Sequence, residues 1–443
     1  MARDAFAAAV DQTATTLSDT QTAEQPIIGV SLTDPIDCLI TLFAVWQAGH
    51  CAVLVSPSIK DAEKARVIAK TGATLWIGDP GTERLAPVNA APGDYPDAAL
   101  ILMTSGTTGD PKGVTHSLHT LRQRITANVA EIGEATFAQT LCTLPLFFGH
   151  GLIGNSLTAM AAGGTLHLWP QPRIDELPSF GQTLDAQGIT FFSSVPTFWR
   201  MVLATSPRPE TPPQRVQVGS APLSQQLWAE ISDWCGTDQV HNTYGMTETA
   251  NWISGGTRAQ SKGQDGYVGQ PWGGEFRVIR DGALQAEGEG EVAVRSPGQM
   301  LGLWGDPGQT DVLMIDGFMR TGDIGRLDPD QRLWLIGRSK HEINVGGIKV
   351  LAEEVDLLLE RHPDVAEACA FGLPDPIAGE RPAAAVRTKN PDLTPSDLIT
   401  WCRAEARQDA VPARIEIVDD IPKNDRGKIA RAEVRERMLA QWS

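Results

Sequence analysis

Apolar and polar positions follow two alternating periods along the first 235 residues, with short apolar runs typical of buried strands between longer amphipathic runs typical of helices. Asp34 and Pro35 suit the N-cap and first position of a helix, and Gly49 suits its end. The first predicted elements are strand 26–33, helix 35–47, strand 50–57, helix 58–72 and strand 73–78. This order predicts a βαβαβ unit.

The alternation continues to about residue 234. The further predicted elements are strand 99–106, helix 118–132, strand 139–146, helix 152–163, strands 165–170 and 189–196, helix 197–204, strand 215–220 and helix 224–234. Short connections between strands and helices predict an α/β fold of mostly parallel sheets with helices on both faces. Ligands are then expected at the carboxyl ends of the strands.

After about residue 255 the pattern becomes glycine-rich and strand-like, which predicts a small barrel or an edge sheet. Its elements are 275–280, 290–296 and the hairpin 326–338. Shorter mixed elements follow, which predict a small α+β domain. We therefore expect a large N-terminal domain at 1–337 and a C-terminal lid domain at 338–443, a division that suits a chain of 443 residues.

Composition excludes several classes of protein. The net charge of −17 disfavours a nucleic-acid partner. The longest strongly apolar run, 38–46, is far shorter than the ~20 residues needed for a membrane span, and the N-terminus lacks the pattern of a secretion signal. The six cysteines lie far apart with no CxxC pair, which argues against zinc and disulfide frameworks and favours a cytoplasmic location.

The segment TSGTTGDPKG, residues 104–113, follows an apolar strand and has the composition of an anion-binding loop. Glycines adopt positive φ angles cheaply, which lets successive backbone N–H groups face one anion, and threonine hydroxyls and a lysine add donors. The loop is not a Walker A sequence, because Pro111 and not glycine precedes Lys112. Read alone, the segment fits a surface turn equally well.

Eight segments in order give the chain a family resemblance. They are TSGTTGDPKG, LPLFFGHG, VGSAPLS, NTYGMTET, GEGEVAVRS, RTGDIG, GRSKHEINVGGIKV and PKNDRGKIAR. The chain resembles the adenylate-forming superfamily of acyl-CoA synthetases, adenylation domains and luciferases. The resemblance implies that a small-molecule carboxylic acid attacks Mg²⁺-bound ATP, which releases pyrophosphate, and that coenzyme A then displaces AMP while the lid domain rotates between the two steps.

The resemblance assigns the phosphates and the nucleotide to residues of the large domain. Tyr244 would stack on adenine, Thr247 would contact the α-phosphate, and Glu248 would bind Mg²⁺. The implied cradle for the β- and γ-phosphates is Thr104, Ser105, Gly106, Thr107, Thr108, Gly109 and Lys112. Further implied nucleotide contacts are Ser220, Ala221 and Thr243.

The resemblance also assigns residues around the domain boundary. Asp323 would accept both ribose hydroxyls, Arg338 would contact ribose and phosphate, and Lys340 would be the hinge. Gly347 would line the entry path of the coenzyme A arm and Lys349 would touch a phosphate of that cofactor, although a plain hairpin explains Gly347 equally well.

Near the C-terminus, Lys428 follows Gly427 in PKNDRGKIAR and matches the adenylation lysine. Its ammonium would bridge the substrate carboxylate and the α-phosphate, offsetting the repulsion between two anions.

The acyl pocket is implied by the segment LPLFFGHG and its neighbours. Its expected walls are Phe147, Phe148, His150, Ser194, Gly219, Ser220, Gly245 and Met246. Amino-acid-activating relatives place an Asp in this segment, and none lies between Leu141 and Gly154. An aromatic or aliphatic acid is therefore favoured over an amino acid, because an apolar wall does not compensate a buried ammonium group.

The glycine loop falls early for the family, so a strand–helix stretch at the N-terminus is expected to be missing, which would alter pocket edges or the face of a homodimer.

Three readings of the function remain open. The first is a stand-alone acid–CoA ligase that forms AMP. An adenylation protein that loads a carrier protein is the second reading, which the end of the chain at Ser443 disfavours. A non-catalytic nucleotide-binding relative is the third, and intact Lys112, Glu248, Asp323 and Lys428 weigh against it.

Overall fold

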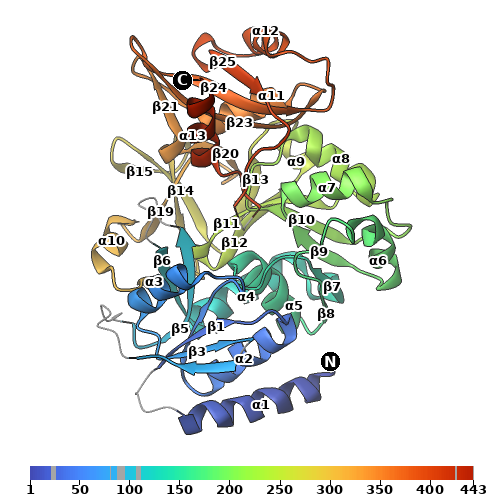
Figure 1. The fold of residues 1–443 in the computed structure, drawn as a ribbon, viewed down its shortest axis with the longest axis vertical. Helices are drawn as coiled ribbons and strands as arrows, with labels where there is room; N and C mark the ends of the chain where they lie inside the picture. Colours follow the sequence, from blue (N-terminus) through green and yellow to red (C-terminus); the bar gives the residue numbers. More distant parts are fainter. Residues whose placement is uncertain (21–25, 80, 87–94, 106–110, 425–426, 443) are drawn as a thin grey trace.

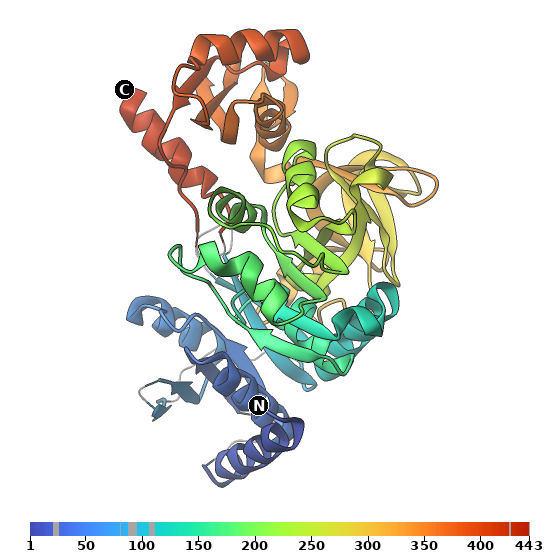
Figure 2. The ribbon, with the colours of Figure 1, turned by 90° about the vertical axis from the view of Figure 1, so that its right-hand side faces the viewer.

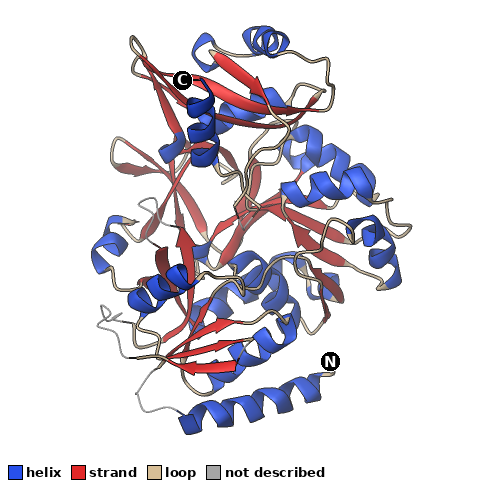
Figure 3. Ribbon diagram, viewed as in Figure 1, coloured by secondary structure: helices blue, strands red, loops and turns tan. Residues whose placement is uncertain are grey.

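Three sheets stacked along the long axis of the molecule form the framework of the computed structural model, with most helices on the outside (Figures 1 and 3). The structure describes residues 1–20, 26–79, 81–86, 95–105, 111–424 and 427–442. The first sheet lies at the N-terminal end, the second in the middle and the third at the C-terminal end (Figure 2). The predicted α/β architecture with a smaller α+β domain is confirmed.

The described strands of the first sheet pair in the order β17-β6-β5-β2-β1-β3-β4. Their bounds are β1 Ile27–Ser31, β2 Cys51–Leu54, β3 Leu75–Gly78, β4 Gly81–Arg84, β5 Ala98–Ser105, β6 Pro111–Ser117 and β17 Gly302–Leu303. The central strands β5, β2, β1 and β3 run parallel, as expected, and the outer strands are antiparallel. Helices α2 (Pro35–Gln47) and α3 (Asp61–Thr71) pack in two separate cores on opposite faces of this sheet.

The first helix of the chain, α1 (Arg3–Thr20), was not predicted. It packs along α2, where Phe6 meets Phe43 edge to face at 5.6 Å and Val10 and Leu17 enter the same core. The spacing of Phe6, Val10 and Leu17 is helical, so the signal was present in the sequence. Asp34 caps α2 as expected, accepting hydrogen bonds from the backbone N–H groups of Ile36 and Asp37.

The second sheet joins a parallel half to an antiparallel half. Its described strands follow the order β15-β14-β16-β19-β20-β13-β12-β11-β10-β9-β7-β8, with β18 paired to β19. The parallel half consists of β7 Gln139–Cys142, β8 Thr165–Leu168, β9 Phe191–Ser194, β10 Arg215–Gly219 and β11 Val240–Met246. The other half consists of β12 Asn251–Thr257, β13 Tyr267–Pro271, β14 Glu275–Arg280, β15 Ala283–Gln285, β16 Gly288–Arg295, β18 Met314–Ile315, β19 Phe318–Leu327 and β20 Leu333–Arg338.

Helices cover both faces of the parallel half. On one face lie α6 Phe180–Ala186, α7 Pro196–Thr205 and α8 Gln225–Cys235, and on the other α4 Leu118–Ile132 and α5 Thr158–Ala161. Shorter elements are η1 Glu134–Phe137, η3 Leu177–Ser179, η4 Thr247–Thr249, α9 Arg258–Ser261 and α10 Pro307–Val312. One hydrophobic core contains residues of both the first and the second sheet, and the site described below lies at the edge of this core.

The segment 152–163, which was predicted to be one helix, is a π-helix followed by a short α-helix in the structure. It begins earlier, as a π-helix η2 (His150–Leu157), and only its last turn is α-helical. All its residues from 150 to 157 are buried, and Ser156 and Thr158 donate hydroxyl hydrogen bonds five residues back to the carbonyls of Gly151 and Ile153. Such wide turns are rare and occur frequently at functional sites.

The third sheet forms the lid domain with three helices. Its described strands are β21 Glu342–Val345, β22 Ile348–Leu351, β23 Val365–Asp375, β24 Gly379–Thr388 and β25 Arg414–Ile417. The helices are α11 Ala352–Glu360, α12 Pro395–Glu405 and α13 Arg431–Trp442, and the short turns are η5 Ser339–His341 and η6 Gln408–Ala410. A span across a membrane would need a longer and more apolar helix than any in the described ranges.

Candidate active site

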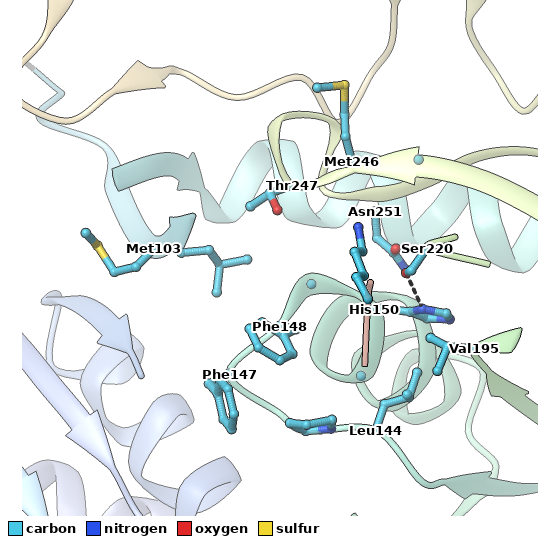
Figure 4. Close-up of a pocket in the computed structure, with 16 residues that line it drawn as sticks. Met103, Leu144, Phe147, Phe148, His150, Val195, Ser220, Met246, Thr247 and Asn251 are labelled. Atoms are coloured by element: carbon cyan, nitrogen blue, oxygen red, sulfur yellow. Dashed lines mark hydrogen bonds between the residues drawn. The ribbon is translucent and has the colours of Figure 1, made fainter. Parts of the chain in front are cut away.

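A small cavity lies at the carboxyl ends of the parallel strands of the second sheet, and Figure 4 shows residues that line it. It encloses about 90 Å³. Its apolar lining includes Leu102, Met103, Leu144, Pro145, Phe147, Phe148, Val195 and Met246. Its polar lining includes His150, Ser220, Thr247, Asn251 and Lys428. The expected place for a ligand in a parallel sheet therefore holds a mixed apolar and polar pocket.

His150 is a buried, neutral wall of this cavity. Its Nδ1 lies 2.9 Å from the Ser220 hydroxyl, the bond drawn in Figure 4, and its Nε2 bonds the hydroxyl of Ser193. Its ring also meets the edge of Trp252, with centroids 5.3 Å apart. Burial, together with the charge of Lys428, lowers the pKa of His150 to about 3. The predicted wall residue is thus held in one orientation without charge.

The turn after β10 brings backbone close to this histidine. At Gly219 a Cβ atom would lie 2.5 Å from the hydroxyl and 3.0 Å from the carbonyl oxygen of Thr243, so only glycine fits between the two strands. The next residue, Ser220, has φ of 68°, a conformation that costs free energy for a residue other than glycine. This turn directs the Ser220 hydroxyl toward His150.

A second close approach lies at β11. A Cβ on Gly245 would lie 2.1 Å from the carbonyl oxygen of Asn251, because β11 and β12 meet there at a register shift. Asn251 itself has φ of 87° and borders the cavity. Gly245 therefore serves backbone packing and also borders the cavity, and Asn251 is a lining residue that the sequence did not reveal.

Tyr244, Asp323 and Arg338 form one connected group. The Tyr244 hydroxyl donates to Asp323 Oδ2 at 2.5 Å, and Arg338 Nε lies 2.7 Å from Asp323 Oδ1. Asp323 and Arg338 face each other in the β19–β20 register. Burial first, and the adjacent Asp323 carboxylate second, raise the pKa of Tyr244 well above its ordinary value. The three predicted nucleotide residues thus lie together, although their contacts with a nucleotide stay predictions.

Thr247 and Glu248 begin the short turn η4 beside the cavity. The Thr247 carbonyl accepts a hydrogen bond of 2.8 Å from Nε2 of His116. His116 is a fully buried residue of β6 that belongs to none of the sequence motifs. Burial lowers the pKa of His116 to about 4, so the ring is neutral and donates from this nitrogen. Burial raises the pKa of Glu248, and the charges of Arg338 and Lys112 oppose that rise.

The glycine-rich loop connects β5 and β6, which form an antiparallel hairpin. Its two ends face each other, because Thr104 pairs with Lys112 in the register. Lys112 is half-buried and close enough to affect the pKa of Glu248. The predicted cradle residues Gly106, Thr107, Thr108 and Gly109 lie outside the described residues, as does the side chain of Ser105.

The lid contributes Lys428 to the cavity. The preceding Gly427 has φ of 69°, and a Cβ there would lie 3.0 Å from the Thr197 hydroxyl at the start of α7. Gly427 therefore lies directly against the large domain, and Lys428 lines the cavity. Two segments far apart in the sequence thus meet at the cavity. The role of Lys428 in adenylation stays a prediction.

Other predicted residues of the lid lie away from the cavity. Lys340 is the middle residue of η5, and η5 begins directly after β20. Gly347 has φ of 92° in the exposed β21–β22 turn, where its N–H donates to the Asn344 side chain, and Lys349 pairs with Glu342 at 3.2 Å. The hairpin explanation accounts for the conformation of Gly347, and contacts with coenzyme A stay predictions.

Some predicted wall and nucleotide residues lie behind the cavity surface. Ser194 is fully buried and is absent from the described lining, whereas its neighbours Ser193 and Val195 hold His150 and line the cavity. Thr243 is buried and donates to the Val218 carbonyl, and Ala221 follows Ser220 in the turn. A strand exposes alternate residues to each face, so a shift of one position exchanges wall and core.

Comparison with known proteins agrees with this geometry. Residues 81–304 match the AMP-binding enzyme family, and residues 354–428 match the AMP-binding enzyme C-terminal domain. The chain belongs to the AMP-binding enzymes. Among curated members, it is 33% identical to "Probable CoA ligase CCL9" of Humulus lupulus and 33% identical to "Oxalate--CoA ligase" of Arabidopsis thaliana. These alignments cover 79% and 77% of this chain and 68% of each relative.

Solved structures of AMP-binding enzymes share the fold. The o-succinylbenzoate CoA synthetase (MenE) of Bacillus subtilis, in complex with its acyl-adenylate intermediate, has a TM-score of 0.84 at 24% identity, over 97% of this chain and 92% of that one. ATP-bound MatB of Rhodopseudomonas palustris has a TM-score of 0.83 at 23% identity, over 99% and 93%. The expectation of an AMP-forming acid–CoA ligase is confirmed at the level of the family. A further structure of the Bacillus subtilis MenE, 24% identical to this chain, holds ATP and a magnesium ion.

Proposed function

We propose that this AMP-binding enzyme activates a small carboxylic acid to an acyl-adenylate in the described cavity and then transfers the acyl group to coenzyme A. The observation that carries this proposal is the entry of Lys428 from the lid into the cavity lined by His150 and Thr247. A cation at that point would offset the charge of a carboxylate that approaches a phosphate.

The residues of the large domain would hold the nucleotide. Asp323 would exchange its present partners, Tyr244 and Arg338, for the ribose hydroxyls in whole or in part. Thr247 would contact the α-phosphate. The hydrogen bond from His116 to the Thr247 carbonyl would fix the backbone of η4. This fixed backbone would keep the phosphorus aligned with the acid in the cavity.

Glu248 would hold Mg²⁺. Metal-binding groups of three or more His, Cys, Asp or Glu side chains do not occur in the described ranges, so this carboxylate would be one ligand among phosphate oxygens and waters. That donor set suits Mg²⁺, which retains water and binds through one or two carboxylates. When bound, the ion would neutralise phosphate charge.

The acid is proposed to be small and without an ammonium group. Phe147 and Phe148 pack against each other at 4.4 Å on one side of the cavity, and neutral His150 closes another. A cavity of about 90 Å³ has room for a short aliphatic or compact aromatic acid. Relatives include enzymes named for the small acids oxalate and sulfoacetate. Others are named for long-chain fatty acids, so the preference for a small acid rests on the cavity.

The test is CoA-dependent AMP release over a panel of short, medium, long and aromatic acids, with ATP–pyrophosphate exchange measured in parallel. We expect exchange and free acyl-CoA with one or more small acids. Exchange without acyl-CoA would favour loading of a carrier protein instead. No exchange with any acid would contradict the proposal and favour a non-catalytic nucleotide-binding protein. Light scattering of the same preparation tests whether the protein is a monomer or a homodimer.

A further inference from the structure

Helix α7 of the large domain contacts the lid through a charged residue that stands in none of the sequence motifs. Arg200 Nη2 lies 2.8 Å from Glu360 Oε1 at the end of α11, and its Nη1 donates to the carbonyl of Ala366. The exposed fractions of the two side chains are 18% and 9%. This is a largely buried contact between the two domains.

Glu360 belongs to a group of acidic lid residues that are otherwise neutralised within the lid. Arg431 pairs with Asp356 at 2.6 Å, and Lys423 pairs with Glu367 at 3.0 Å. Among the residues that the structure describes, Glu360 forms its ion pair with Arg200 alone, across the domain interface. Removal of one partner from a buried ion pair leaves an uncompensated charge, which is costly.

The same helix carries the contact beside Lys428. A Cβ atom on Gly427 would lie 3.0 Å from the hydroxyl of Thr197, at the start of α7. Arg200 lies three residues later on the same helix face. Both lid contacts therefore depend on one placement of the lid against α7. In that placement Lys428 lines the cavity.

We propose that Arg200 is a positioning residue for adenylation, which holds the lid against α7 through Glu360 so that Lys428 enters the cavity. The expected effect on adenylation rests on the proposed function. The expected effect on the placement of the lid rests on the domain interface alone. Without the ion pair the lid would lie against α7 for a smaller fraction of time, and the carboxylate and phosphate would lack their cation. Thioester formation from supplied acyl-adenylate would not need that cation.

The kinetic experiment compares Arg200→Met, Glu360→Gln and the double variant with the wild type. We expect at least about a fivefold loss of ATP–pyrophosphate exchange in each single variant, a range typical of coupling between sites, with less than a twofold change in thioester formation. The double variant should lose no more than either single one, because both remove the same contact. The control is Lys389→Met, which removes the exposed pair with Glu230 and should change neither reaction by more than twofold.

A structural experiment keeps this inference separable from the proposed function. Spin labels on cysteines introduced at Ile174 in the large domain and Ile377 in the lid, which are 71% and 90% exposed, report the distance between the domains. We expect Arg200→Met to reduce the population at the wild-type distance. An unchanged distance distribution, an equal loss in both half-reactions, or unchanged exchange would each overturn the role of Arg200. Absence of exchange in the wild type with a shifted distance in the variant would overturn only the proposed function.

Discussion

Lys428 contributes a charge to a cavity whose other described walls come from the large domain. Its effect is already visible on His150, whose pKa it lowers in addition to the effect of burial. A cation with so direct an electrostatic influence is suited to a step that brings two anions together. We therefore propose that the function of this lysine depends on the position of the C-terminal domain as much as on its own chemistry.

Replacement of Lys428 by alanine should separate the two half-reactions. We expect Lys428→Ala to lose at least about 100-fold in ATP–pyrophosphate exchange, which is the scale seen when one transition-state donor is removed. Thioester formation from supplied acyl-adenylate should remain, because the charge repulsion has then been overcome. Rapid-quench assays of each half-reaction measure this, with Lys423→Ala as a nearby control. Equal loss in both half-reactions would remove the assigned role.

Residues in the site differ in how well the sequence revealed them. Lys428, His150 and Thr247 were recognised because each stands in a motif with a chemical reason for its residue type. His116 and Arg200 were not, because each acts through a contact with a residue more than 100 positions away in the sequence. A single sequence records side-chain chemistry but not which distant backbone carbonyl or carboxylate a side chain meets.

At the scale of elements, the close packing of β11 against β12 places Met246, Thr247 and Asn251 around the cavity. The two strands approach so closely at Gly245 that backbone atoms occupy the space of a side chain. On the other side, the buried π-helix η2 presents His150 at its first turn. Regular elements therefore position these residues, and few of them stand on long loops.

The close approach at Gly245 predicts a large effect of one methyl group. We expect Gly245→Ala to lower the free energy of unfolding by about 1–3 kcal/mol, because the added atom meets backbone that has no free space, and to reduce pyrophosphate exchange. Urea unfolding and the exchange assay measure the two effects. Gly308→Ala in α10 is the matched control, since a Cβ there meets nothing within 4 Å. Equal stability of the two variants would contradict the packing argument.

The short turn η5 is the element at which lid movement is predicted. Proline at position 340 would disfavour the helical conformation of Ser339 and restrict the backbone that must turn. We expect Lys340→Pro to reduce overall acyl-CoA formation by impairing at least one half-reaction, whereas Lys340→Ala should retain both. Separate assays of adenylation and thioester formation measure this. Full activity of the proline variant in both would place the hinge elsewhere.

At the scale of the whole molecule, acid should destabilise the fold through buried neutral histidines. Burial lowers the pKa of His116 to about 4 and the pKa values of His150 and His241 to about 3. An unfolded chain binds these protons below about pH 6.5, while the folded chain does not. The free energy of unfolding contributed by each group is therefore intact above pH 6.5 and falls as pH decreases toward the folded pKa.

A comparison of His116→Gln with the wild type isolates one of these groups. The variant retains a side-chain N–H that can donate toward Thr247 but does not titrate. Between pH 6 and pH 4.5 we expect the free energy of unfolding of the wild type to fall more steeply than that of the variant, by about 1.4 kcal/mol per pH unit. Urea unfolding at several pH values measures both slopes. Parallel slopes would show that His116 takes up its proton in the folded state.

The sequence by itself determined the family, the order of most strands and helices, and the residue types at the site. It did so because hydrophobic periodicity reports local structure and because the motifs combine glycine, carboxylate and lysine at spacings that the chemistry needs. The α/β fold and its small C-terminal domain followed from that pattern.

Only the tertiary structure decided which of these residues share a surface. It showed that Ser193 and not Ser194 contacts His150, that β11 and β12 leave no room beyond glycine, and that Arg200 meets Glu360 across the domains. The physical reason is that register, close approach and domain contact depend on the simultaneous packing of distant segments. Local periodicity carries no record of such packing.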